Sequence, residues 1–147
     1  MDADGIRPDP TRVEALAQWP APSSATELKS FLGGINFYRK FVLHFSQLAR
    51  PLHQIFNTTN KFVWNAEANR HFAHLKQALY SSPVLKLSNL SQPFEIELDA
   101  SQYAIGAILK QGGHPIAYHS ETLFDAKKNY NTYDKEFYSL VQALKQW

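Results

Sequence analysis

The chain has 147 residues, of which 44% are hydrophobic and 19% charged, and this composition excludes a wholly disordered polypeptide. Cysteine is absent, which excludes disulfide scaffolds, thiolate zinc sites and cysteine nucleophiles. No apolar run approaches the roughly 20 residues that span a bilayer, so we expect no membrane partner. The first ten residues are acidic and polar, unlike a signal peptide, and favour an intracellular protein.

The formal net charge is only +2, but the charges are unevenly distributed. Residues 1–90 carry ten Lys and Arg against six Asp and Glu, whereas residues 91–147 carry five against seven. A basic half is typical of a protein that binds a polyanion such as a nucleic acid. From charge alone, a random surface imbalance explains the pattern about as well.

The first half of the chain is predicted to be mostly helical. Asp9-Pro10 is a typical helix start, and Trp19-Pro20-Ala21-Pro22 ends that helix because proline cannot continue it. Ser24 and Glu27 form a capping box for a longer helix. Its apolar residues recur at three- and four-residue spacing: Leu28, Phe31, Leu32, Ile35, Tyr38 and Val42. Two further helices are predicted, over 46–56 and from Asn65 to about residue 80.

The pattern changes to strands near residue 84. Residues 84–87 are short and strand-like, and residues 94–99 alternate strictly between apolar and acidic side chains. Two more strands are predicted over 103–109 and 115–119, followed by a helix from about Thr132. That helix has an apolar stripe of Tyr133, Phe137, Leu140, Val141 and Leu144. The sequence therefore predicts an α+β protein, with a helical domain over 1–83 and a three-stranded antiparallel sheet with one helix over 84–147.

Asp99 and Glu136 are the candidate metal ligands. Asp99 ends a predicted strand, and Glu136 lies in the first turns of the last helix. Carboxylates in these two places can converge on a hard cation such as Mg²⁺, which prefers oxygen ligands. Phosphodiester hydrolysis with two metal ions needs several such groups. From spacing alone, two solvated acidic residues are the better interpretation, because no short motif enforces the pairing.

Arg39 and Lys40 are the candidate nucleic-acid contacts. They lie in Asn36-Phe37-Tyr38-Arg39-Lys40-Phe41, which mixes aromatic and basic side chains. The two cations suit phosphates, and an aromatic ring can stack on bases or sugars. Most of these aromatic residues, however, are predicted to pack in the core.

Several motifs follow one another in an order that identifies a family. Trp19-Pro20-Ala21-Pro22 precedes Tyr38-Arg39-Lys40-Phe41, and Phe62-Val63-Trp64 precedes Asp99-Ala100-Ser101 and Tyr133-Asp134-Lys135-Glu136-Phe137. Over residues 5–147 this order resembles the reverse transcriptase of gypsy-type LTR retrotransposons. The resemblance implies a thumb and connector over 1–83 and the N-terminal part of a ribonuclease H-like domain, hence an incomplete ribonuclease H-like fold, over 84–147.

The resemblance also implies roles for single residues. Asp99 matches the first catalytic carboxylate of the family's ribonuclease H site and Glu136 the second, both as ligands of Mg²⁺. The family's third and fourth carboxylates would follow Trp147, and the polymerase palm would precede residue 1. We therefore expect this chain to be inactive alone. Where many members have Ser-Arg and Ala-Glu, this sequence has Ser120-Glu121 and Ala126-Lys127, and we expect the reversed charges still to pair.

The implied partners are a template–primer duplex or RNA–DNA hybrid and the remainder of the Pol polyprotein. An alternative interpretation is a host-retained, non-catalytic interaction protein that binds a protein partner at an open sheet edge, since an unpaired edge is a template for another chain. An enzyme whose missing carboxylates come from a second chain ranks last.

Overall fold

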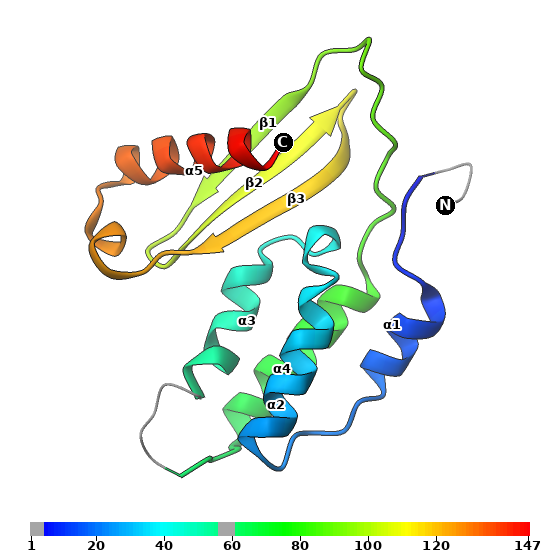
Figure 1. Ribbon diagram of the computed structural model, residues 1–147, viewed down its shortest axis with the longest axis vertical. Helices are drawn as coiled ribbons and strands as arrows, with labels where there is room; N and C mark the ends of the chain where they lie inside the picture. The colour runs from blue at the N-terminus through cyan, green and yellow to red at the C-terminus, as the bar shows by residue number, and fades with distance from the viewer. Residues whose placement is uncertain (1–4, 56–60) are drawn as a thin grey trace.

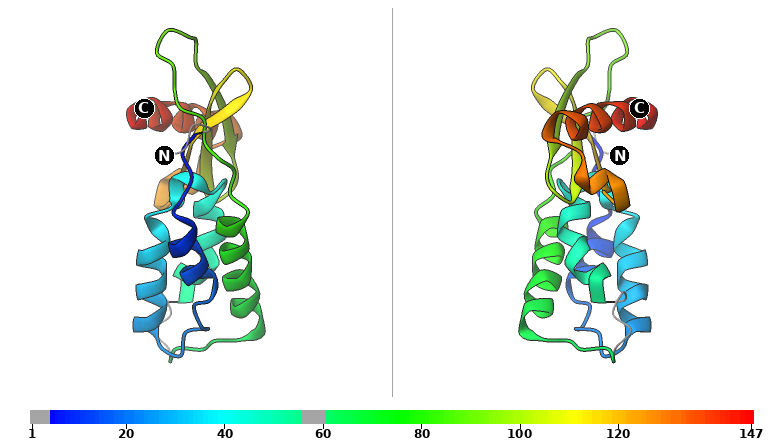
Figure 2. Two further views of the ribbon diagram at one scale, coloured as in Figure 1. Left: turned by 90° about the vertical axis from the view of Figure 1, so that its right-hand side faces the viewer. Right: turned by 90° about the vertical axis from the view of Figure 1, so that its left-hand side faces the viewer.

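The computed structural model describes residues 5–55 and 61–147 (Figure 1). Four helices come first: α1 (Pro10–Ala17), α2 (Ala25–Asn36), α3 (Phe45–Gln54) and α4 (Ala66–Tyr80). Strands β1 (Glu95–Ala100), β2 (Ala104–Gln111) and β3 (His114–Thr122) follow, and then α5 (Thr132–Gln146). We call residues 5–55 and 61–83 the helical half and residues 84–147 the sheet half, and the two halves lie end to end (Figure 2). The predicted α+β class is confirmed. No helix of the described ranges is long and apolar enough to cross a membrane.

The helix starts follow the predicted capping signals. The Asp9 carboxylate accepts a hydrogen bond from the Thr11 N–H at 3.0 Å, and the Ser24 hydroxyl accepts one from the Glu27 N–H at 3.2 Å. The Glu27 carboxylate reaches back one residue further than in a standard capping box, because it accepts from the Ser23 N–H at 2.7 Å. That hydrogen bond lowers the pKa of Glu27. These local interactions set where α1 and α2 begin.

The long helix predicted to run to Val42 is shorter than expected. Helix α2 ends at Asn36, and the chain turns through the 3₁₀ segment η1 (Arg39–Phe41) into α3. His44 precedes α3 with a left-handed backbone (φ 57°), which reverses the chain direction. Pro51 lies inside α3 without dividing it. The predicted end of this helix, Phe56, lies outside the described residues.

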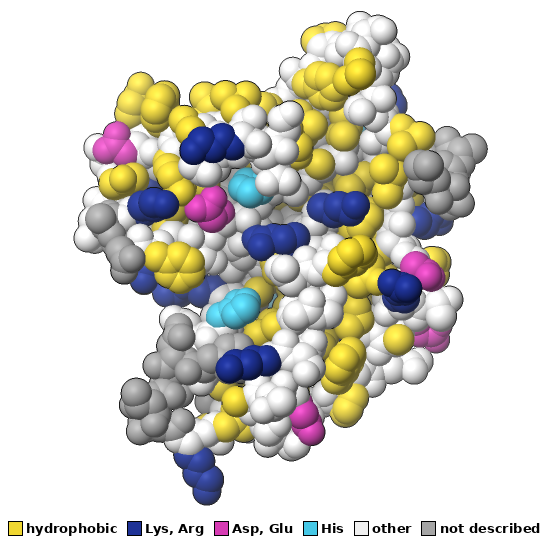
Figure 3. Space-filling view, viewed as in Figure 1, with side chains coloured by type: hydrophobic (Ala, Val, Ile, Leu, Met, Phe, Trp, Pro, Cys, Tyr) yellow, Lys and Arg dark blue, Asp and Glu magenta, His cyan; other side chains and the backbone are white. Residues whose placement is uncertain are grey.

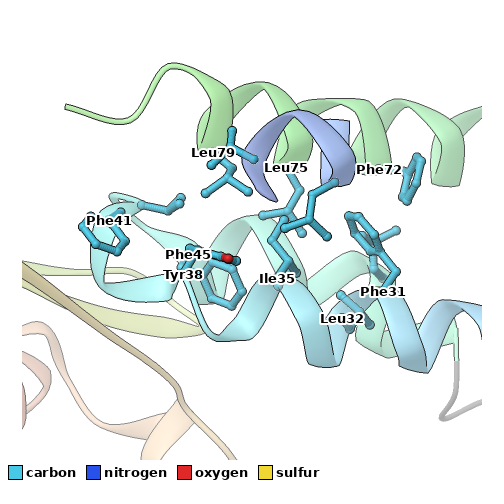
Figure 4. Close-up of a cluster of buried hydrophobic side chains, with 14 of the residues drawn as sticks. Phe31, Leu32, Ile35, Tyr38, Phe41, Phe45, Phe72, Leu75 and Leu79 are labelled. Atoms are coloured by element: carbon cyan, nitrogen blue, oxygen red, sulfur yellow. The ribbon is translucent and has the colours of Figure 1, made fainter. Parts of the chain in front are cut away.

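A single hydrophobic cluster holds the helical half together (Figure 4). Phe31 of α2 is fully buried, with its ring centroid 4.6 Å from that of Phe72 in α4 and 6.0 Å from that of Trp19. Each fully buried side chain of this kind contributes about 1.5–3 kcal/mol. The cluster includes Leu32, Ile35, Tyr38, Phe41, Phe45, Leu75 and Leu79. The apolar spacing therefore identified the core although it misplaced the end of α2.

The sheet has the predicted antiparallel order β1-β2-β3. In its register Asp99 pairs with Gly106, and Gly106 pairs with Ser120. Helix α5 covers one face, and its Ser139 hydroxyl donates to the Gly106 carbonyl at 2.9 Å (Figures 1 and 2). The strand predicted over 84–87 is wrong, because this segment makes one isolated bridge, between Leu85 and Ile6.

The predicted apolar stripe of α5 is only partly covered, since Leu140 and Val141 are half-buried and its other three residues are exposed. Tyr133 is 76% exposed, Phe137 60% and Leu144 59%, whereas Lys135, Ser139 and Ala143 are buried. The small side chains of Ser139 and Ala143 let the helix approach β2 at Gly106, and Tyr133, Phe137 and Leu144 are left exposed. The apolar spacing predicted the helix, but the residues that are buried against the sheet, Lys135, Ser139 and Ala143, lie outside that spacing.

Candidate functional site

Arg39 lies between the two halves of the molecule. Its guanidinium group donates to the Ser120 carbonyl at 2.6 Å and to the Ser46 hydroxyl at 2.9 Å, and it lies 5.3 Å from the Phe45 ring centroid. Burial lowers the pKa of Arg39, and the nearby Glu121 carboxylate opposes this effect. The Arg39 side chain therefore forms hydrogen bonds within this chain. These bonds connect η1 to α3 and β3.

Two histidines lie beside Arg39 at this junction. His53, with Arg39, Ser46 and Glu121, lines a cavity of about 270 Å³. Burial lowers the pKa of both His53 and His119, and the positive charge of Arg39 lowers each further. The Glu121 carboxylate raises the pKa of His119 and so partly opposes these two effects. Both imidazoles are therefore harder to protonate in the folded chain than in the unfolded chain.

We expect the chain to lose stability on mild acidification. Because the folded-state pKa values of His53 and His119 lie below the ordinary value of 6.5, protonation favours the unfolded state. This contribution is complete above about pH 6.5 and decreases as the pH falls from there toward the folded-state pKa values. Urea unfolding at pH 7.5 and 5.5 measures the loss as a lower midpoint. Replacing both histidines with Gln should flatten this dependence on pH. Equal urea midpoints of the wild-type chain at the two pH values would contradict the prediction.

Lys40 is exposed, with its ammonium group 5.1 Å from the Phe41 ring centroid. Of the neighbouring aromatic residues, Tyr38 and Phe41 are buried as predicted. Phe37 is the exception to the prediction that most of these aromatic residues pack in the core, because its side chain is 72% exposed. It follows the end of α2, where the surface is open to solvent.

Phe37 continues a line of surface positions on α2. Lys29, Gly33 and Phe37 are four residues apart, and Phe37 keeps helical backbone angles (φ −59°, ψ −28°), so the three share one side of the helix. A Cβ on Gly33 would meet no atom within 4 Å. We call these three residues the α2 stripe. It combines a cation, a backbone open to close approach and an exposed aromatic ring.

The two candidate carboxylates lie on the sheet half. The Asp99 side chain at the end of β1 is 57% exposed, and one of its oxygens lies 3.5 Å from the Nδ1 atom of His44 in the helical half. Glu136 is exposed in the second turn of α5. Over residues 5–55 and 61–147, no group of three or more His, Asp and Glu side chains is placed to hold a metal ion. The structure thus supplies two carboxylates from the expected elements.

Sequence reasoning missed His44. It reaches Asp99 because its left-handed backbone turns the chain toward the sheet, and because Gly106, opposite Asp99, has no side chain there. A Cβ on Gly106 would lie 3.5 Å from the His44 Nδ1 atom. A non-glycine residue with positive φ leaves no clear mark in a sequence, so no signal predicted this contact.

The reversed charges, Glu121 near the end of β3 and Lys127 in the segment before α5, are connected through a third side chain. The Lys127 ammonium group donates to the Tyr138 hydroxyl at 2.7 Å, and that hydroxyl donates to Glu121 at 2.8 Å. The Tyr138 oxygen, and the Glu121 carboxylate to a lesser degree, raise the pKa of Lys127. The pairing that the sequence suggested is therefore indirect, and it connects β3 to α5.

Comparisons with known proteins identify the family. Residues 64–147, from just before α4 to the end of α5, match the model for the RNase H-like domain found in reverse transcriptase. The chain is 36% identical over 143 residues to the retrovirus-related Pol polyprotein from transposon 297 of Drosophila melanogaster. It is 33% identical over 148 residues to the transposon Tf2-3 polyprotein of Schizosaccharomyces pombe. Each alignment covers 97% of this chain but only 14% and 11% of those polyproteins.

Solved structures agree with this assignment. A foamy viral protease-reverse transcriptase dRH in complex with double-stranded DNA superposes on 97% of this chain, with a TM-score of 0.85 and 25% identity. The foamy viral protease-reverse transcriptase in complex with an RNA/DNA hybrid covers 92%, with a TM-score of 0.82 and 25% identity. The chain covers 26% and 19% of those two proteins. With the match over residues 64–147, these similarities show that the chain belongs to the family of RNase H-like domains found in reverse transcriptases and corresponds to part of the reverse transcriptase region of a retroelement Pol polyprotein.

Proposed function

We propose that the chain forms the thumb, the connector and the first part of the ribonuclease H-like domain of a gypsy-type LTR retrotransposon reverse transcriptase, with the boundary near residue 83. In this proposal the thumb holds a template–primer duplex or an RNA–DNA hybrid inside the cell. The ordered motifs from Trp19-Pro20-Ala21-Pro22 to Asp99-Ala100-Ser101 support it. The similar foamy viral enzymes bound to double-stranded DNA and to an RNA/DNA hybrid support the choice of ligand.

The α2 stripe is the observation that carries this proposal. Gly33 allows the backbone or groove of a duplex to approach α2 closely, because no atom would stand within 4 Å of a Cβ there. The exposed Phe37 ring packs on sugars or base edges, and Lys29 adds positive charge at the other end. Lys40, in η1 three residues after Phe37, adds a second positive charge next to the stripe. Arg39 supports it by fixing η1, since its guanidinium group bonds to β3.

The α2 stripe makes a sharp prediction for binding. Replacing Gly33 with Leu places a side chain where the duplex would lie, and we expect at least about tenfold weaker binding, or about 1.4 kcal/mol. Helix propensity favours Leu over Gly by roughly 1 kcal/mol, so the fold should be retained. Fluorescence anisotropy with a labelled 20-base-pair duplex and a matching hybrid measures the effect.

Two further variants control this experiment. Gly33→Ala keeps a small side chain and should cause a smaller loss than Gly33→Leu. Phe37→Ala removes the exposed ring and should weaken binding without unfolding the chain, because this side chain packs little in the core. Wild-type affinity in both Gly33→Leu and Phe37→Ala would contradict the proposed role of the α2 stripe.

Asp99 and Glu136 are proposed as Mg²⁺ ligands of the parent enzyme. Their carboxylate oxygens are the donors that Mg²⁺ prefers, so the donor chemistry fits, although two carboxylates are only part of a two-metal site. Bound Mg²⁺ would stabilise charge on the phosphodiester and generate the attacking hydroxide. Asp99 would present one ligand from the end of β1, and Glu136 would present a second from α5.

A non-catalytic interaction protein is the second candidate. Within the described residues, β1 has no strand neighbour on its outer side, and the outer face of α5 exposes Tyr133, Phe137 and Leu144. An open strand edge and exposed apolar side chains both suit a protein partner. A chain that binds neither duplex nor hybrid in the anisotropy experiment would favour this candidate.

A further inference from the structure

A groove runs along the surface between α1 and the segment from α2 to η1. It consists of two hollows of about 330 and 300 Å³ that share Arg12, Phe37 and Tyr38 as lining residues. We call it the α1–α2 groove. Figure 3 shows hydrophobic side chains with Lys and Arg side chains among them on the face of the molecule that includes α1 and α2.

The two ends of the groove differ in chemistry. The first hollow is mostly apolar, and its remaining lining residues are Ala15, Leu16 and Gly34. The second hollow is basic, because Arg7 and Lys40 join Arg12 in lining it. Asp9 also lines the second hollow, and its carboxylate, which accepts a hydrogen bond from the Thr11 N–H as the cap of α1, offsets one of these positive charges. Three cations and one carboxylate thus lie next to an apolar surface, which leaves the second hollow net positive.

This arrangement is complementary to the backbone of a nucleic-acid strand, in which apolar sugar faces alternate with anionic phosphates. Phosphates bind Lys and Arg and release condensed counterions, and this release drives association. Phe37 lies in both hollows and also ends the α2 stripe, so the groove continues directly from that stripe. A strand held by α2 can therefore pass into the groove without leaving the protein surface.

We propose that the α1–α2 groove binds the sugar–phosphate backbone of one strand of the nucleic acid that the α2 stripe holds. Arg12 and Lys40 contact successive phosphates, Arg7 adds to their field, and the apolar hollow beside Gly34 takes a sugar. This inference rests on the proposed function, because it gives the duplex a second point of attachment on the same half of the molecule.

The salt dependence of binding tests the charged end. Each phosphate contact contributes about 0.9 to the slope of log K against log salt for duplex DNA. We expect Arg12→Gln and Lys40→Gln each to lower the slope by about that amount and to weaken binding about eightfold at 100 mM salt. Lys61→Gln is the matched control, because Lys61 is exposed but lines neither hollow of the groove, so the slope should stay unchanged.

A neutral variant tests the apolar end. Replacing Gly34 with Leu fills the hollow, and its Cβ would lie 3.7 Å from the Leu16 Cδ2 atom, an ordinary van der Waals contact. The helix should therefore accept the change. We expect about fivefold weaker binding, since lost packing of roughly 1 kcal/mol corresponds to about that factor. Gly33→Leu, on the adjacent residue of the same helix, tests the α2 stripe under the same conditions.

The outcomes separate this inference from the proposed function. In one outcome Gly33→Leu weakens duplex binding, but Arg12→Gln, Lys40→Gln and Gly34→Leu do not. This result would contradict the proposed role of the α1–α2 groove and leave the proposed function intact. If Lys61→Gln lowers the slope of log K against log salt by the same amount, the role of the groove is also contradicted, because the effect of charge would then be general. If the wild-type chain binds neither duplex nor hybrid, both the role of the groove and the proposed function are contradicted.

Discussion

Replacing Arg39 with Ala should destabilise the folded chain by about 2–3 kcal/mol, more than any other single surface-charge substitution that we predict. The change removes the hydrogen bonds from the guanidinium group to the Ser120 carbonyl and the Ser46 hydroxyl. Ser46 and Ser120 are buried, so their polar groups would lose a charged donor in a place with little water. Urea unfolding followed by circular dichroism measures the effect.

Two variants separate the role of Arg39 from a general effect of charge. Arg39→Lys keeps the charge but lacks the planar fork that reaches two acceptors, so an intermediate loss is expected. Arg70→Ala removes an exposed arginine whose partner, Glu67, is 3.7 Å away, and this should cost less than about 0.5 kcal/mol. An Arg39→Ala chain as stable as Arg70→Ala, yet with weaker duplex binding, would instead make Arg39 a phosphate contact.

The second large effect concerns hydrolysis of RNA in an RNA–DNA hybrid. We expect this chain alone to leave a labelled hybrid uncut in Mg²⁺ or Mn²⁺, because two carboxylates cannot position two divalent ions. In a longer reverse transcriptase that includes this segment, Asp99→Asn or Glu136→Gln should lower the hydrolysis rate at least about 10³-fold. That factor corresponds to several kcal/mol of lost stabilisation by the metal ions.

Glu97 provides the matched control for Asp99. It lies two residues earlier on β1, is exposed, and forms an ion pair with Lys110. Glu97→Gln should therefore leave the hydrolysis rate of the longer enzyme unchanged. Cleavage by this chain alone that Asp99→Asn abolishes would mean that another molecule, such as a second copy, completes the site.

The sequence by itself determined the elements and much of the core. Asp9, Ser24 and Asn65 cap helices where predicted, because a side-chain oxygen satisfies backbone N–H groups within two or three residues. The alternation over 94–99 predicted β1, since a strand places successive side chains on opposite faces. The order of motifs also led to the family, which the comparisons confirm at the level of a retroelement reverse transcriptase.

The tertiary structure decided which faces of these elements are used. Periodicity predicted α5, but Ser139 closely approaches Gly106, and Tyr133 and Phe137 are left exposed. Apolar residues continued past Asn36, yet η1 and the left-handed His44 turn the chain toward β3. Capping and alternation depend on neighbours within a few residues, so a sequence carries them directly. The bonds of Arg39 to Ser120 and the exposure of Phe37 depend on residues far along the chain, and only the packed structure brings those together.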